Sequence, residues 1–288
     1  MKAVSATEKR QRLRALISTA RIVHPASVFD PLSARCAQDE GFEVSMLAGS
    51  VASLVILGAP DLVIVTLSEL AALCRRICRA ADLPLLVDAD HGFGNALSVQ
   101  RTVQELEAAG VAAMTIEDTQ LPGAFGTNQE TLVSIEEATG KITAAIAART
   151  DPETLIVART SLPLAPLEDI VARVRAYETA GADAIFLSGP KTRAQISAIA
   201  QATRLPLVLG RITRELDDAD FLTSHRVRLV LQGHKPCLAA IQAMRDTLRQ
   251  LAAGVPPAQI QAVASDELVD QLTRRKAYDR LAADTLGG

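Results

Sequence analysis

Short apolar runs alternate with longer amphipathic segments from residue 26 to residue 254. The apolar runs have the length of buried strands, and in the segments between them apolar residues recur every three or four positions, as on one face of a helix. This rhythm predicts a parallel sheet whose strands are joined by helices. We expect eight strands, at residues 26–30, 44–49, 83–90, 112–118, 154–160, 182–188, 205–210 and 227–233.

The connecting segments carry helix signals of their own. Residues 167–181, LEDIVARVRAYETAG, have the helical spacing and end at Gly181, a residue that commonly stops a helix. Eight such units predict an α/β fold, a (β/α)₈ TIM barrel, in which reactive groups lie at the C-terminal ends of the strands. We expect one catalytic barrel domain at residues 1–254 and a C-terminal helical extension at residues 255–288.

The extension starts with Pro256 and Pro257 and continues as a helical stretch over about residues 258–284 that belongs to no strand-helix unit. It could pack on its own barrel. It could also be exchanged with a neighbouring subunit, because the Pro-Pro break would let the helix swing away. The sequence leaves both arrangements open.

Composition narrows the class of protein. With 288 residues, 49% hydrophobic and 22% charged, the chain is expected to be a folded globule. The net charge of −3 and the absence of a basic run argue against nucleic acid or an anionic membrane as partner and favour a small molecule. No run reaches the 18 apolar residues of a membrane span, and four cysteines without a C-x-x-C pair suit a reducing cytoplasm.

Acidic residues follow two of the predicted strands. LLVDADHGFG at residues 85–94 ends in Asp88 and Asp90 before a glycine-broken turn, and AAMTIED at residues 112–118 contains Glu117. Two strand ends could therefore bring three carboxylates around one hard cation, and such oxygen ligands suit Mg²⁺ or Mn²⁺. Each acid alone could equally be an ordinary solvated strand end.

Several motifs together resemble the isocitrate lyase and phosphoenolpyruvate mutase superfamily, most closely its oxaloacetate decarboxylase family. They are SVFDPLSAR, AGSVASLVILGAPD, VDADHGFGN, TIEDTQLP, VART and QGH, and the resemblance covers about residues 20–250. It implies Mg²⁺-dependent decarboxylation of oxaloacetate, a 2-oxo dicarboxylic acid, to pyruvate and CO₂. It also fits a homo-oligomer, a dimer or tetramer with swapped C-terminal helices.

The resemblance implies roles for particular residues. Asp88 would bind Mg²⁺ directly or through water, with Asp61, Asp90 and Glu117 as further ligands or holders of its waters. Asp61 in GAPD could otherwise be a helix N-cap. Manganese is a possible replacement for magnesium.

The resemblance also implies substrate-binding residues. Ser50, preceded by Gly49, would meet a substrate carboxylate or enolate oxygen, although it could simply cap a helix that starts near Val51. Arg159 would clamp a carboxylate or, alternatively, form a structural ion pair with a barrel acid. His234 would orient the substrate or move a proton, while a lone histidine is more often a packing residue.

Two departures bear on the reaction. The loop at residues 121–134 lacks the cysteine that lyases of the superfamily carry there, which a decarboxylase can tolerate since no acid is needed to remove CO₂. The seventh strand ends in Gly210 and Arg211, where the decarboxylase family leads us to expect a polar and aromatic turn. The alternatives are therefore a carbon–carbon lyase acting on a 2-alkylmalate or methylisocitrate-like substrate, and a non-catalytic binder of oxalate-like acids.

Overall fold

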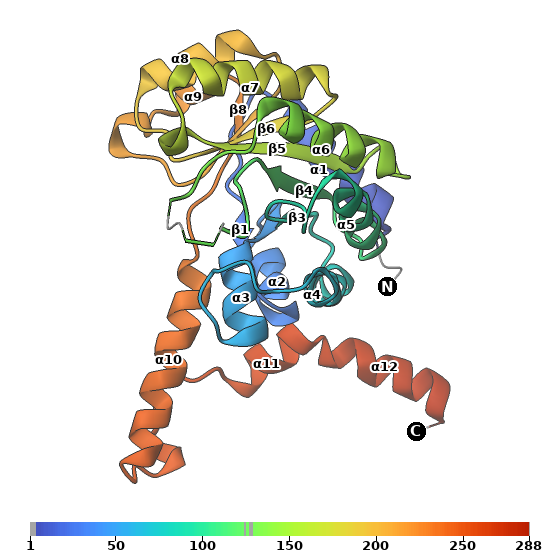
Figure 1. The fold of residues 1–288 in the computed structure, drawn as a ribbon. Coiled ribbons are helices and arrows are strands. Elements are labelled where there is room, and N and C mark those ends of the chain that lie inside the picture. The colour runs from blue at the N-terminus through green and yellow to red at the C-terminus, as the bar shows by residue number, and fades with distance from the viewer. Residues whose placement is uncertain (1–3, 124, 127–128, 288) are drawn as a thin grey trace.

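The structure, a computed structural model, describes residues 4–123, 125–126 and 129–287. Eight parallel strands lie in the order β1 to β8, which is also their order along the chain (Figure 1). The strands are β1 (Ala26–Ser27), β2 (Ser45–Leu47), β3 (Leu85–Asp88), β4 (Ala113–Glu117), β5 (Leu155–Ser161), β6 (Ala184–Ser188), β7 (Leu207–Leu209) and β8 (Val227–Val230).

The sheet curls into the predicted (β/α)₈ barrel. A parallel bridge between Val23 and Leu229 joins the start of the chain to β8, so that the last strand lies beside the first. All eight predicted strands are confirmed. Most are shorter than their apolar runs, at one end or both; β6, for example, starts two residues later than expected and ends at the expected Ser188.

Helices follow the strands as the pattern predicts. Helix α7 ends just before Gly181, as its sequence predicts. Gly181 has a φ of 95°, in the left-handed region that glycine tolerates. The helices are α1 (Ala6–Ser18), α2 (Pro31–Asp39), α3 (Gly49–Leu57), α4 (Leu67–Ala80), α5 (Ala96–Ala108), α6 (Ile135–Ala148), α7 (Leu167–Thr179), α8 (Arg193–Ala202), α9 (Ala219–Ser224), α10 (Lys235–Ala252), α11 (Asp266–Thr273) and α12 (Arg275–Leu286), with short 3₁₀ turns η1 (Leu162–Leu164), η2 (Arg214–Leu216) and η3 (Pro257–Gln259).

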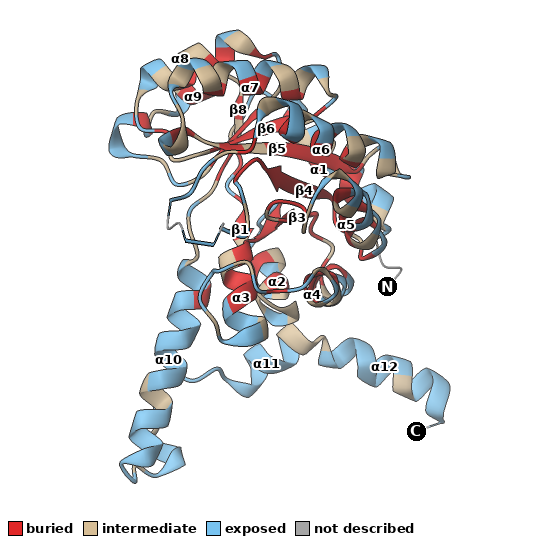
Figure 2. Cartoon of the chain, in the orientation of Figure 1, coloured by how far each residue is buried: buried red, intermediate tan, exposed pale blue. Residues whose placement is uncertain are grey.

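The hydrophobic core lies within the barrel and between the barrel and its helices (Figure 2). The central strands are buried on both faces, as parallel strands covered by helices require, and residues such as Leu86, Met114 and Ile156 are fully inaccessible. Among the described residues, no helix combines the length and apolar character that crossing a bilayer requires.

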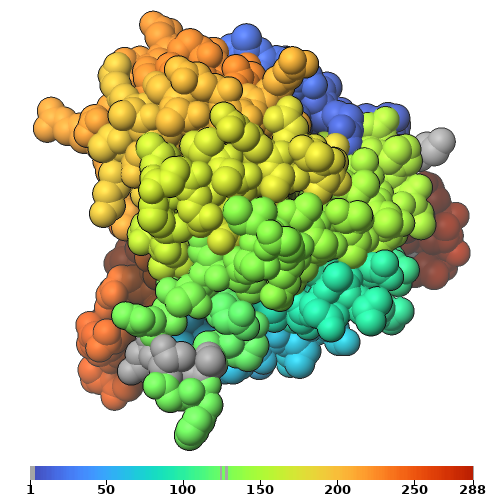
Figure 3. Space-filling model, turned by 45° about the horizontal axis from the view of Figure 1, so that its top comes forward, coloured from blue at the N-terminus to red at the C-terminus, as the bar shows by residue number. Residues whose placement is uncertain are grey.

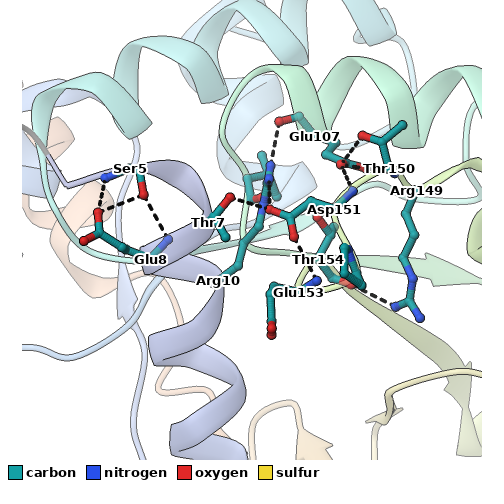
Figure 4. A network of polar contacts seen from close by, with 12 residues as sticks. Ser5, Thr7, Glu8, Arg10, Glu107, Arg149, Thr150, Asp151, Glu153 and Thr154 are labelled. Atoms are coloured by element: carbon teal, nitrogen blue, oxygen red, sulfur yellow. Dashed lines mark hydrogen bonds and ion pairs between the residues drawn. The ribbon is translucent and has the colours of Figure 1, made fainter.

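Helix α1 packs against the N-terminal end of the barrel through a network of polar contacts, which Figure 4 shows. The buried Arg10 guanidinium donates to the carbonyls of Glu107 and Val111, at 2.7 and 3.0 Å, and pairs with Asp151 at 2.6 Å. The Glu107 carboxylate in turn accepts hydrogen bonds from the backbone and hydroxyl of Thr150. This network stabilises the N-terminal end of the barrel, so the opposite end is available for the active site.

The C-terminal helices stand apart from the barrel. Helix α10, the eighth barrel helix by sequence, extends away from the strands as an exposed rod, and α12 also projects from the body (Figures 1, 2 and 3). The single helical stretch expected over residues 258–284 is wrong in detail, since α11 and α12 are separate helices that meet at Arg274, whose φ is 60°. The proposed division at residue 254 stays a prediction.

Helix α11 packs on the barrel of its own chain. Arg35 of α2 donates to the carbonyl of Leu272 at 2.9 Å, and Arg274 pairs with Asp39 at 2.6 Å.

Candidate active site

Three of the expected site residues lie side by side at the mouth of the barrel because their strands are neighbours. Glu117 at the end of β4 is paired in register with Arg159 on β5, and Asp88 at the end of β3 is paired with Thr115 on β4. Side chains two residues apart on a strand point the same way, so Thr115 and Glu117 share one face. The strand register alone thus gathers two acids, a hydroxyl and a guanidinium.

Arg159 forms ion pairs with both acids. Its Nη1 lies 2.6 Å from Asp88 Oδ2 and its Nε lies 3.1 Å from Glu117 Oε2, while its guanidinium stacks over the Phe186 ring at 5.3 Å. Burial alone would lower the pKa of Arg159, but the charges of Asp88 and Glu117 raise it. In this structure Arg159 therefore forms ion pairs with barrel acids, which the sequence analysis gave as the alternative to a substrate clamp.

Asp88 is held as an ionised carboxylate. Burial acts to raise the pKa of Asp88, yet Arg159, the Thr115 hydroxyl and the Gly49 amide together lower it below its usual range. The Thr115 hydroxyl donates to Asp88 Oδ1 at 2.8 Å. Gly49 is the first residue of α3, so an amide at a helix N-terminus supports the negative charge.

Asp90 occupies a strained turn. Its φ of 47° is rare for a residue with a side chain, and its carbonyl accepts the Glu117 amide at 2.8 Å. A Cβ at Gly49 would lie 2.6 Å from Asp90 Oδ1, so glycine is needed for the two to approach. Burial and the charges of Asp88 and Glu117 raise the pKa of Asp90 to about 8.

Glu117 is also a weakened acid. Burial raises its pKa to about 7, with Arg159 acting in the opposite direction and Asp88 reinforcing the rise. Near neutral pH these raised pKa values favour a protonated Asp90 and a partly protonated Glu117, whereas Asp88 is ionised beside Arg159.

Asp61 comes from the loop between α3 and α4 and is exposed. Partial desolvation of its carboxyl group and the charge on Asp88 raise its pKa. The alternative that it caps a helix is wrong, because the N-cap of α4 is Thr66. In the described part of the chain, no three histidine, cysteine or acidic side chains are grouped as a ready metal cluster, and Arg159 stands between two of the expected ligands.

Ser50 lies inside the first turn of α3. The N-cap of this helix is Ala48, which has no side-chain cap, so the alternative in which Ser50 caps the helix is wrong. The first turn of an α-helix has amides without intrahelical partners, and the Gly49 amide is among the groups that lower the pKa of Asp88.

His234 lies at the start of α10, just beyond β8. Its Nδ1 is 3.0 Å from the hydroxyl oxygen of Ser27 on β1. Burial lowers the pKa of His234, although the charges of Asp88 and Asp61 act to raise it. The His234 ring is therefore close enough to Asp88 and Asp61 for their charges to affect its pKa.

Sequence reasoning missed three residues that contact this group: Thr115, Phe186 and Ser27. Thr115 could have been found, since it stands two positions before Glu117 and so faces the same way. Phe186 and Ser27 carry no local signal, because their partners Arg159 and His234 are distant in sequence. Arg211, whose presence departs from the family pattern, is exposed at the end of β7.

Comparison with known proteins identifies the relatives of this chain. The sequence profile of the phosphoenolpyruvate phosphomutase family matches residues 13–252. A curated protein of Rhodopseudomonas palustris (strain BisB18), named oxaloacetate decarboxylase, is 56% identical over 280 residues, or 97% of each chain. A protein of the same name from Bradyrhizobium diazoefficiens is 49% identical over 97% of each chain.

Solved structures with this fold are also similar. A phosphonopyruvate hydrolase in complex with oxalate and Mg²⁺ has a TM-score of 0.82 and 30% identity, over 96% of this chain and 99% of that one. An oxaloacetate acetylhydrolase bound to 3,3-difluorooxalacetate has a TM-score of 0.84 and 26% identity over 99% of both chains. A 2,3-dimethylmalate lyase has a TM-score of 0.84 and 27% identity, over 98% of this chain and 96% of that one.

Proposed function

The chain belongs to the phosphoenolpyruvate mutase and isocitrate lyase superfamily, and from that membership we propose that it is a lyase that decarboxylates oxaloacetate to pyruvate and CO₂. The observation that carries the proposal is near-complete alignment, at 49–56% identity, with relatives named oxaloacetate decarboxylase. The acids and the arginine at the mouth of the barrel provide the chemistry that a dicarboxylic substrate needs.

The residues at the mouth fit a magnesium ion. Asp61, Asp88, Asp90 and Glu117 offer only carboxylate oxygens, and the raised pKa values of Asp90 and Glu117 reflect burial and then neighbouring negative charge, both of which a divalent cation would offset. We assign these four acids to Mg²⁺, directly or through water, with Mn²⁺ as a substitute. When bound, the ion would supply Lewis-acid stabilisation for the negative charge that grows on the 2-oxo oxygen as CO₂ leaves.

Arg159 is the proposed partner of a substrate carboxylate. Its guanidinium has five N–H donors; Nη1 donates to Asp88, while Nε lies 3.1 Å from Glu117 without a hydrogen-bond partner among the described residues. Stacking on Phe186 holds the guanidinium plane at the mouth, where it can meet a carboxylate with further donors.

Ser50 and His234 complete the proposed substrate site. Ser50 and neighbouring amides of the first turn of α3 would bind the oxygen that becomes negatively charged. His234 would either orient the substrate or return a proton to the enolate carbon. Removal of CO₂ itself requires no protein acid, because the electron pair of the breaking bond moves into the enolate.

A product assay tests this function. The purified protein with Mg²⁺ and oxaloacetate should form pyruvate faster than Mg²⁺ and oxaloacetate alone, a control needed because this acid decomposes slowly by itself. Equal rates would overturn the proposal and favour the binder of oxalate-like acids. The second candidate function is a carbon–carbon lyase, which similarity to a 2,3-dimethylmalate lyase supports. Cleavage of a 2-alkylmalate, without pyruvate formation from oxaloacetate, would favour the lyase.

We also propose that the protein assembles as a homo-oligomer, a dimer or tetramer, through its C-terminal helices. Along α10, apolar side chains at positions 238, 241, 244, 248 and 251 are 40–59% exposed in the single chain. An apolar groove of about 710 Å³ lies at the root of this helix, lined by Phe29, Leu32, Phe42 and Pro236 among others. The α10 helix of a second copy is the proposed occupant, since such faces are rarely left in water.

In this proposal, the helix that contacts a second copy is α10, whereas the sequence led us to expect an exchange of residues 258–284.

The thiols of Cys36, Cys74, Cys78 and Cys237 are free, which supports the expected cytoplasmic location.

A further inference from the structure

A side-chain hydrogen bond at the mouth of the barrel links the first strand to the segment that follows the last strand. It connects Ser27 on β1 with His234, 207 positions later, at 3.0 Å between Oγ and Nδ1. His234 is also the N-terminal boundary residue of α10. The bond therefore fixes the imidazole at the seam of the barrel, next to the proposed substrate site.

The bond also constrains where the imidazole hydrogen lies. A serine hydroxyl has one hydrogen to donate, and a neutral imidazole has one N–H and one acceptor nitrogen. Among the described residues, His234 Nδ1 is the hydrogen-bond partner found for Ser27 Oγ. If Nδ1 carried the hydrogen, the serine hydroxyl would have no protein acceptor for its own.

The surroundings of the ring bear on its protonation state. Burial lowers the pKa of His234, which favours the neutral ring over imidazolium near neutral pH. A neutral imidazole is a hydrogen-bond donor but a poor proton donor.

We propose that Ser27 is a positioning residue, which holds His234 as the neutral tautomer with its hydrogen on Nε2, so that His234 binds a substrate oxygen as a hydrogen-bond donor. This deepens the proposed function, on which the substrate contact rests. It chooses between the two roles left open for His234, and it leaves the proton for the enolate carbon to come from solvent.

The tautomer can be tested without any assay of activity. In ¹⁵N-labelled protein, with the His234 signals assigned by their loss in His234→Gln, Nε2 should be protonated and Nδ1 should be an acceptor above neutral pH. Ser27→Ala should shift the Nδ1 resonance, and Ser27→Thr should restore it. Protonated Nδ1 in the wild type would overturn the inference whether or not the protein decarboxylates oxaloacetate.

Kinetics then test the role of the ring. Glutamine can place an amide N–H near the position of Nε2, whereas alanine cannot, so His234→Gln should retain activity that His234→Ala loses. Ser27→Ala should lower kcat/KM up to about tenfold, the effect of one hydrogen bond. Equal loss in the Gln and Ala variants would contradict donation without proton transfer.

Ser45→Ala is the matched control. Ser45 lies on the neighbouring strand β2, and its hydroxyl donates to the Pro84 carbonyl at 3.1 Å. It removes the same hydroxyl from the same barrel, so it should leave both the His234 resonances and kcat/KM unchanged. A change as large as that of Ser27→Ala would mean that barrel packing, rather than the bond to His234, explains the effect.

Discussion

Asp88 and Asp90, with one residue between them, have pKa values shifted in opposite directions. Asp88 ends a regular strand and receives donors from Thr115, Gly49 and Arg159, which lower its pKa. Asp90 lies in the turn beyond, where burial and neighbouring carboxylates raise its pKa to about 8. Backbone direction, rather than residue type, decides which acid is ionised.

Gly49→Ala should impair catalysis while the fold persists. The new Cβ would lie 2.6 Å from Asp90 Oδ1, and the carboxylate can turn away at little cost in stability because it is the end of a side chain. We expect kcat/KM to fall at least about tenfold, as small displacements in a site do, with an unchanged melting temperature. Gly140→Ala, in helix α6 with no atom within 4 Å, is the control and should leave kinetics intact.

Arg159→Ala should lower kcat/KM by about 100-fold, because it removes charge-assisted hydrogen bonds of about 1.5–3 kcal/mol to a charged substrate group. Steady-state kinetics with oxaloacetate measure the effect. The control is Arg101→Ala, which removes an exposed ion pair with Glu105 on α5. Wild-type kinetics in Arg159→Ala would refute the clamp and leave only the ion pairs seen in the structure.

At the scale of elements, α10 is one of the described helices that the barrel of its own chain leaves exposed. Its 18 residues make a rod about 27 Å long. Apolar side chains at 241, 244, 248 and 251 recur at the spacing of a helix that packs against another helix. Among the described residues of α10, Cys237 in the first turn is the only one that is buried.

Met244→Glu should therefore break the proposed oligomer, because it places a charge in the middle of the apolar face, where Met244 is 57% exposed in the single chain. Light scattering coupled to size exclusion should show a smaller species. Gln250→Glu introduces the same side chain elsewhere on α10 and should keep the wild-type mass. A wild-type protein that is already monomeric would refute the assembly.

At the scale of the whole molecule, the two ends of the barrel differ in purpose. Arg10 and α1 seal the base with ion pairs and backbone hydrogen bonds. The mouth instead concentrates carboxylates with raised pKa values, an arrangement that lowers stability and is typical of functional sites.

This predicts an unusual dependence of stability on pH when metal is removed with EDTA. The folded pKa values of Asp90 and Glu117, about 8 and 7, lie above the ordinary 3.8 and 4.5, so in this range the folded state binds more protons than the unfolded state. Stability from these groups is then lost as pH rises towards 8. Thermal melts should show this fall.

Saturating Mg²⁺ should reduce the fall, because it favours the ionised carboxylates of the folded state. The Asp90→Asn, Glu117→Gln double variant should flatten the EDTA curve without metal. A wild-type melting temperature in EDTA that rises from pH 5 to pH 8 would contradict the assigned charge crowding.

The sequence determined the barrel and the location of its chemistry. Strand and helix periodicity is local, so each of the eight units could be predicted from its own residues, and parallel strands necessarily bring Asp88, Glu117 and Arg159 to one end. The motifs around Gly49 and Asp90 also indicated the family, which the relatives confirm.

Only the tertiary structure decided which groups meet. Arg159 takes two acids and Phe186 as partners, and Ser27 reaches His234, because strand register and barrel closure set these contacts across long sequence distances. The direction of α10 was equally hidden, since an amphipathic helix shows that one face is to be buried but not against which surface. Periodicity specifies a segment, whereas pairings between distant segments depend on the packing of the whole chain.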